Sequence, residues 1–161
     1  INMGYTHYWK QNTVSPNYSD QASKVSIEIP ILLELMPKYS TSAGGYYQEH
    51  PILLKSGDGT GDPEIYKAFI CFNGDGSKDL DHETFYYEFE PKPFEFAFCK
   101  TARKPYDLAV CLCLLSLANH IDTFEFSSDG DREDWQTAID IYTKYHNGEI
   151  SENLSSLISN L

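Results

Sequence analysis

The stretch Phe94-Glu-Phe-Ala-Phe-Cys-Lys-Thr-Ala-Arg-Lys-Pro-Tyr-Asp107, continued by Leu108–His120, decides the fold of this 161-residue chain. Its three phenylalanines alternate with other residues, which predicts a strand whose aromatic face is buried. Pro105 suits the first turn of a helix, because its ring fixes φ and an N–H there would lack a partner anyway. The residues that follow carry no polar stripe at helical spacing and are too few to span a bilayer. We therefore expect a buried central helix over 105–120.

The segments around this helix predict the rest of the sheet. Phe124 and Phe126 repeat the alternating pattern after the helix, so strand, helix and strand indicate a right-handed βαβ unit. Short turns separate the strand-like runs Pro51–Lys55, Ile65–Asn73 and His82–Phe89, and such connections favour antiparallel pairing. We expect a single α+β domain with a mostly antiparallel sheet of five or six strands. Two or three helices should cover mainly one face of that sheet.

The N-terminal third is less uniform. Met3–Lys10 is aromatic and predicts a first strand, with Met3 as the natural start and no basic-then-apolar leader. Asp20–Tyr39 has mixed periodicity, which favours a helix kinked or broken at Pro30 and ended near Pro37. A short strand before Pro30 is the alternative.

We expect the domain to occupy residues 3–147 and an amphipathic helical tail to occupy 148–161. The tail has apolar residues at helical spacing, namely Leu154, Leu157, Ile158 and Leu161. These residues could dock the tail on the domain or pair two copies of the chain as a homodimer.

Composition excludes several classes of partner. The formal net charge of −12 argues against nucleic acid, whose phosphates are bound by clustered Lys and Arg, and against an anionic membrane surface. It suits a basic protein partner. The four cysteines, Cys71, Cys99, Cys111 and Cys113, form no Cys-x-x-Cys pair, and we interpret them as reduced thiols of a cytoplasmic protein.

Three pieces of the chain carry a resemblance. They are Met3-Gly-Tyr-Thr-His-Tyr-Trp9, Phe72-Asn-Gly74 with His82-Glu-Thr-Phe85, and Phe98-Cys-Lys-Thr-Ala-Arg-Lys-Pro-Tyr-Asp107 followed by Ser127-Ser-Asp-Gly130. Together they resemble an uncharacterised protein family found mainly in bacteria and their phages. That family has no assigned activity, so the resemblance implies motif positions and no mechanism.

The basic turn before the central helix is the first candidate site. Lys100, Arg103 and Lys104 precede a helix N-terminus, where the helix dipole disfavours cations, so a negative group should compensate them. A bound phosphate or carboxylate would do so. The alternative is that the chain's own acids do so, from Asp75–Asp81, Asp129–Asp134 or Asp107. The expected ligand-binding residues are Lys100, Thr101, Arg103, Lys104, Tyr106 and Asp129.

Three residues are weak catalytic candidates: Cys99, His7 and His82. Cys99 lies near the basic turn, but Arg103 comes too soon after it for a cysteine-phosphatase loop. Both histidines lie among aromatic residues, where a structural role is the alternative. The sequence has no metal-binding spacing and its acidic loops fit no EF-hand, so we expect no metal and no cofactor.

Three functions remain open from the sequence. The first is a small acidic cytoplasmic protein that binds an anionic ligand or a partner chain near 100–104. The second is a hydrolase or transferase that acts on a phosphorylated or nucleotide-like substrate through the same turn. The third is an interaction or immunity-type protein whose acidic face neutralises a basic partner.

Overall fold

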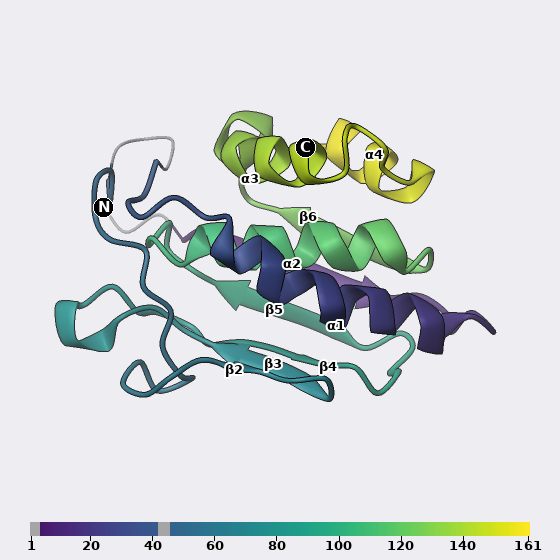
Figure 1. Ribbon diagram of the computed structural model, residues 1–161, viewed down its shortest axis with the longest axis horizontal. Coiled ribbons are helices and arrows are strands. Elements are labelled where there is room, and N and C mark those ends of the chain that lie inside the picture. The colour runs from purple at the N-terminus through teal and green to yellow at the C-terminus, as the bar shows by residue number, and fades with distance from the viewer. Residues whose placement is uncertain (1–3, 42–45) are drawn as a thin grey trace.

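The computed structural model describes residues 4–41 and 46–161, so the predicted start at Met3 lies outside the described residues (Figure 1). It is an α+β structure in which two three-stranded antiparallel sheets lie against a layer of helices. The helices are α1 (Tyr18–Glu34), α2 (Asp107–His120), α3 (Arg132–Tyr145) and α4 (Glu152–Ser159), with a short 3-10 turn at Gly76–Lys78. The predicted fold class is confirmed, except that the six strands form two sheets and not one.

The first sheet has the order β5-β1-β6. β1 (Thr6–Gln11) lies between β5 (Phe96–Lys100) and β6 (Phe124–Ser128) and is antiparallel to both. β5 and β6 therefore run parallel, α2 connects them, and β1 is inserted between them as in a split βαβ unit. Near the beginning of the central strand β1, His7 is paired with Cys99 on one side and with Ser128 on the other.

The second sheet has the order β2-β3-β4, with β2 (Glu64–Ile65), β3 (Phe69–Phe72) and β4 (Phe85–Glu88). A turn closed by the Tyr66 N–H and the Phe69 carbonyl splits the single strand expected at 65–73 into a hairpin. The expected strand at 51–55 forms only isolated bridges, at Pro51 and Lys55. The backbone of Glu83 bonds that of Lys100 and joins this sheet to β5.

Helix α2 is the centre of the core, as predicted. Ten of its residues are buried, and it packs against α1, α3, α4 and β6. The helix has apolar side chains all round because neighbouring elements surround it on nearly every side. Figure 1 shows α2 and α1 side by side in front of the sheets, with α3 and α4 above them at the top of the view.

The predicted helix is confirmed as α1, but it runs unbroken past Pro30, so a break at Pro30 and the alternative strand are both wrong. Pro30 is exposed, which leaves the Ser26 carbonyl that it cannot bond on the solvent side of the helix. Val25, Ile29 and Leu32 are buried on the opposite side. Packing on both sides of the proline outweighs the lost hydrogen bond.

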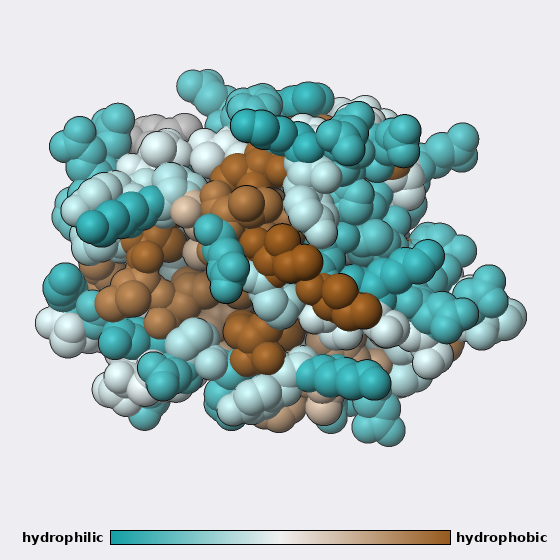
Figure 2. Space-filling model, in the orientation of Figure 1, coloured by the Kyte–Doolittle hydropathy of each residue, from teal (hydrophilic) through white to brown (hydrophobic). Residues whose placement is uncertain are grey.

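The aromatic face of β5 is not buried. Phe94, Phe96 and Phe98 are 71%, 60% and 56% exposed, whereas Cys99 is fully buried. The helices cover the face that carries Cys99, and Phe98 pairs with Tyr8 on the opposite face of the sheet. Figure 2 shows the side of the molecule that the helices cover, where apolar patches lie among hydrophilic residues. The alternation of phenylalanines therefore predicted the strand correctly, but the prediction that its aromatic face is buried is wrong.

The C-terminal segment docks on the same domain. Leu154 and Ile158 of α4 are buried in the core, and Asn153 donates its side-chain N–H groups to the carbonyls of Ala118 and Phe124. A homodimer through this segment stays a prediction. Among residues 4–41 and 46–161, no helix combines the length and the apolar character that crossing a bilayer requires.

We expect Gly74→Ala to lower the free energy of unfolding by about 3 kcal/mol, because a Cβ there would lie 2.0 Å from the Leu80 carbonyl oxygen. The chain would have to move between β3 and β4. Gly148→Ala is the control, since Gly148 has a φ of +80° but a methyl group there would meet no atom within 4 Å, and it should cost about 1 kcal/mol. If urea unfolding gave the same loss of stability for both variants, the clash at Gly74 would be contradicted.

Candidate functional site

The basic turn has an unusual backbone. Ala102 and Arg103 are consecutive non-glycine residues with φ of 54° and 61°, a left-handed conformation that costs about 1–2 kcal/mol per residue. The carbonyl of Tyr5 holds the turn by accepting hydrogen bonds from the N–H groups of Thr101 and Ala102. The Thr101 carbonyl accepts another from Lys104. Tyr5, the residue directly before β1, therefore holds the backbone of the turn in place.

Asp107, the first residue of α2, is hydrogen-bonded to the turn and to β1. Its Oδ1 accepts a hydrogen bond from Thr101 Oγ1 at 2.5 Å and lies 2.6 Å from His7 Nε2. A carboxylate in the first turn of a helix is stabilised by the helix dipole. Residues from the turn, the helix and the first strand thus meet at one carboxyl group.

His7 is held on every side. Its ring is completely buried, and its Nδ1 lies 2.8 Å from Ser128 Oγ, which also accepts the Gly130 N–H at 2.9 Å. Tyr5 and Trp135 pack edge-on against the ring, each with 5.1 Å between centroids. The pairing of β1 with β6 puts Ser128 beside His7. The imidazole orientation is therefore fixed.

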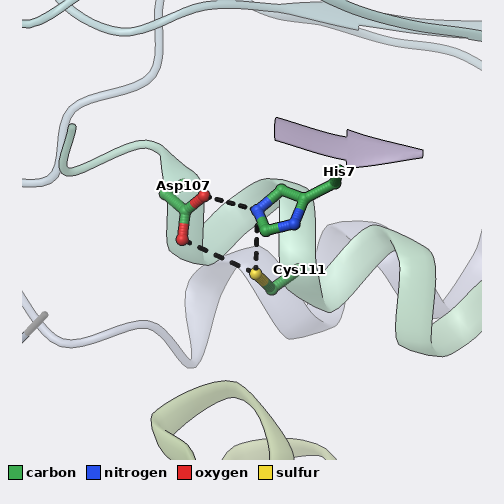
Figure 3. Close-up of side chains that lie close together, drawn as sticks. All are labelled: His7, Asp107 and Cys111. Atoms are coloured by element: carbon green, nitrogen blue, oxygen red, sulfur yellow. Dashed lines mark hydrogen bonds and ion pairs between the residues drawn. The ribbon is translucent and has the colours of Figure 1, made fainter. Parts of the chain in front are cut away.

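Cys111 completes the cluster. It lies four residues after Asp107, so both side chains share one face of α2. Its Sγ is 3.6 Å from His7 Nε2 and 3.6 Å from Asp107 Oδ2 (Figure 3). Burial, and next the nearby Asp107 charge, raise the pKa of Cys111, so in the free protein it is a thiol. We call His7, Asp107 and Cys111 the His-Asp-Cys cluster.

The donor atoms of the His-Asp-Cys cluster are spaced like the ligands of a tetrahedral metal ion. Zinc bonds of about 2.0–2.3 Å that meet at tetrahedral angles separate the donors by about 3.3–3.6 Å. Both distances from Cys111 Sγ match this range. The distance from His7 Nε2 to the other carboxylate oxygen, Asp107 Oδ1, is shorter at 2.6 Å, and an ion would replace the hydrogen bond between them.

A small pocket opens onto the cluster. Asp107 and Cys111 line it together with Lys104, Asp134 and Thr41. A fourth ligand position on an ion held here would face this pocket. An open position is typical of catalytic zinc sites, whereas structural sites use four protein ligands.

The chain's own acids neutralise two of the three basic side chains, which was the alternative to a bound anion. Arg103 pairs with Asp134 at 2.5 Å and lies 4.1 Å from the centre of the Tyr5 ring. Lys104 Nζ donates to the carbonyl oxygen of Asp79 at 2.7 Å, with a carboxylate oxygen of the same residue at 3.5 Å. Among the residues that the structure describes, Lys100 Nζ has no hydrogen-bond or ion-pair partner.

The ion pair of Arg103 with Asp134 makes stability depend on pH. Burial alone would raise the pKa of Asp134, but the hydrogen bond from Arg103 lowers it below its usual value. The pair therefore stabilises the fold above the unfolded pKa of about 3.9, and this contribution is lost as the pH falls through the folded pKa. We expect the melting-temperature difference between wild type and Arg103→Met to be full at pH 7 and to shrink below about pH 4. A difference independent of pH would contradict this.

The other predicted site residues lie outside the cluster. Cys99 is buried beside the carbonyl of Glu83, and burial raises the pKa of its thiol. Tyr106 is buried and donates to the same carbonyl. His82 is exposed and bonds the Lys100 carbonyl, and the Asp129 carboxylate accepts the Thr6 N–H and the Tyr8 hydroxyl. The structure therefore unites His7 with Thr101 of the turn, but not with His82 or with the carboxylate of Asp129.

Sequence reasoning considered Asp107 only as a countercharge and Cys111 only as a core thiol. Their spacing of four residues was the available signal, because it puts a carboxylate and a thiol on one helical face. No spacing could reveal His7, which lies a hundred residues before Asp107.

Comparison with known proteins gives no match, either to a family model, to curated proteins or to solved structures. The resemblance of the three sequence motifs therefore stays an expectation.

Proposed function

We propose that this protein binds a zinc-class divalent ion through His7, Asp107 and Cys111 and hydrolyses a small phosphorylated or nucleotide-like substrate there. The observation that carries the proposal is the convergence of an imidazole, a carboxylate and a thiol at ligand spacing beside an open pocket. An ion with such ligands supplies a bound water of lowered pKa at neutral pH.

The surrounding hydrogen bonds support this assignment. A His7 Nδ1–H donated to Ser128 Oγ would leave the Nε2 lone pair free for the ion, and Thr101 would keep donating to Asp107. Outer partners of this kind orient metal ligands, and their loss typically costs 10–100-fold in affinity. The left-handed backbone at Ala102 and Arg103 is strained, and this strain accompanies the placement of Thr101 beside Asp107.

Lys104 favours an anionic substrate. It lines the pocket together with Asp107, and its ion pair with the exposed carboxylate of Asp79 is long at 3.5 Å, so its ammonium group would exchange this weak pair for a phosphate that approached the ion. A protein of net charge −12 needs such a local cation to attract an anion. A cytoplasmic location, where thiols stay reduced, would keep Cys111 able to bind metal.

Binding of an anion without chemistry is the weaker function. Arg103 and Lys104 already meet Asp134 and Asp79, which leaves Lys100 as the cation of this turn without a partner among the described residues. A basic protein partner is supported only by the net charge.

Cobalt(II) binding tests the proposal, because a cobalt–thiolate bond gives an intense near-ultraviolet charge-transfer band that imidazole and carboxylate ligands do not give. We expect wild type and Cys113→Ala to show this band and Cys111→Ala to lack it. Cys113 is a matched control, since it is a buried thiol on the same helix. Because Cys111 starts as a thiol, zinc binding should release about one proton from it. A band that survives Cys111→Ala would overturn the site.

Hydrolysis is tested separately with the zinc-loaded protein and chromogenic phosphate mono- and diesters. We expect turnover by wild type and Cys113→Ala, and its loss in Cys111→Ala. Zinc bound at Cys111 without any turnover would reject the hydrolase and leave a metal-binding protein.

A further inference from the structure

A second cluster lies at the other end of α2 and begins with a buried carboxylate. Glu28 of α1 is 5% exposed, on the same side of the helix as the buried residues Val25 and Leu32. A buried carboxylate is costly unless charged or hydrogen-bonding groups compensate it. Among the described residues no lysine or arginine pairs with Glu28, so its compensation comes from other groups.

Two histidines approach the same oxygen of Glu28. His120 Nε2 lies 2.5 Å from Oε2, and His146 Nε2 lies 3.1 Å from it. His120 is the last residue of α2, and His146 follows the end of α3, so three helices meet at this point. Both imidazole side chains are largely buried, with exposures of 15% and 20%.

Two polar atoms of this cluster lack partners. Within the part of the chain that the structure describes, neither Glu28 Oε1 nor the Tyr142 hydroxyl forms a hydrogen bond, although both are buried. Burial raises the pKa of Tyr142, and the neighbouring Glu28 raises it further, so the two groups lie close together. Orphaned buried polar atoms are rare, and a small turn of the Glu28 carboxylate would let these two atoms bond each other, with Oε2 left to the histidines.

We propose that Glu28, His120 and His146 form a second site for a zinc-class divalent ion, which ties α1, α2 and α3 together. Two imidazole nitrogens and one carboxylate are a ligand set that zinc and similar ions use in proteins. Donor spacings of about 3.3–3.5 Å around such an ion require His120 Nε2 to withdraw from Glu28 Oε2 by about 0.8–1.0 Å and His146 Nε2 by about 0.2–0.4 Å. The bound ion would neutralise the charge of the Glu28 carboxylate through Oε2. The Tyr142 hydroxyl would donate a hydrogen bond to Oε1.

The second site is independent of the His-Asp-Cys cluster. Asp107 and His120 are the first and last residues of α2, so about 20 Å of helix separates them. The second site has no thiol, and an ion there would produce no thiolate charge-transfer band. Failure of one site therefore leaves the other to be judged separately.

Zinc stoichiometry and thermal shift test the second site in full-length protein. We expect native mass spectrometry to find two zinc ions on wild type, one on Cys111→Ala, one on His146→Gln and none on the double variant. In the Cys111→Ala background, zinc at about 100 times its dissociation constant should raise the melting temperature by about 5–10 °C. Adding His146→Gln should remove that shift.

His146 is the residue to change because it lies at a helix end and is partly exposed, so the variant should fold. His50→Gln, which alters an exposed imidazole outside the cluster, is the control and should keep the shift. Glu28→Gln gives a second route to the same loss. If Cys111→Ala binds no zinc, or if His146→Gln and Glu28→Gln both keep the second ion, the histidines are only hydrogen-bond partners of Glu28 and the proposal is wrong.

Discussion

Asp107→Ala is expected to lower the free energy of unfolding by about 2–5 kcal/mol and to abolish metal binding by the His-Asp-Cys cluster. The substitution leaves His7 Nε2 and Thr101 Oγ1 buried without their acceptor, and each such loss costs about 1–3 kcal/mol. It also removes a carboxylate from the first turn of α2. Urea unfolding and cobalt absorption measure the two effects.

Asp107→Asn separates stability from metal binding. The amide oxygen can still accept from Thr101 and His7, so this variant should keep most of the stability of wild type. It loses the anionic ligand, and we expect its affinity for zinc to fall by about 100-fold or more. If Asp107→Asn bound zinc as tightly as wild type, the carboxylate would not be a ligand.

Trp135→Ala should be among the most destabilising substitutions in the chain, with a loss of about 3–5 kcal/mol. Trp135 is completely buried, stacks on Phe126 with 4.9 Å between centroids and forms one wall around His7. In a chain of this size the loss corresponds to a fall of about 6–20 °C in melting temperature.

Trp135→Phe is the informative comparison. The Trp135 Nε1–H is buried and has no hydrogen-bond partner among the described residues, so a phenyl ring removes a donor that contributes nothing. We expect a cost of less than about 1.5 kcal/mol and retained metal binding. A loss as large as that of Trp135→Ala would show that the indole N–H has a partner, such as an ordered water.

The sequence predicted those parts of the fold for which local pattern and burial agree. The helix over 105–120 was recognisable because a helix without a polar stripe has to be surrounded, and α2 is. The alternation of Phe94, Phe96 and Phe98 could not show which face the helices cover. The face of β5 that carries the small Cys99 side chain is the one that the helices cover. Cys99 pairs with the buried His7 of β1, so both side chains lie on that face. Likewise Pro30 could not break α1, because packing on its inner side decides the helix.

The sites depend on contacts that span the chain. Thr101 and Asp107 belong to one predicted motif, but His7 and Ser128 reach them only through the pairing of β1 with β5 and β6. In the second cluster, a glutamate at an otherwise apolar helical position was a usable signal at Glu28. Its histidine partners lie 92 and 118 residues away, and no local spacing relates them.

Anomalous diffraction at the zinc absorption edge, from crystals grown with zinc, tests the His-Asp-Cys cluster most directly. We expect a peak at bonding distance from His7 Nε2, an Asp107 carboxylate oxygen and Cys111 Sγ, with a fourth position that faces the pocket beside Lys104. Fully occupied zinc elsewhere in the crystal with no peak among these three side chains would contradict it.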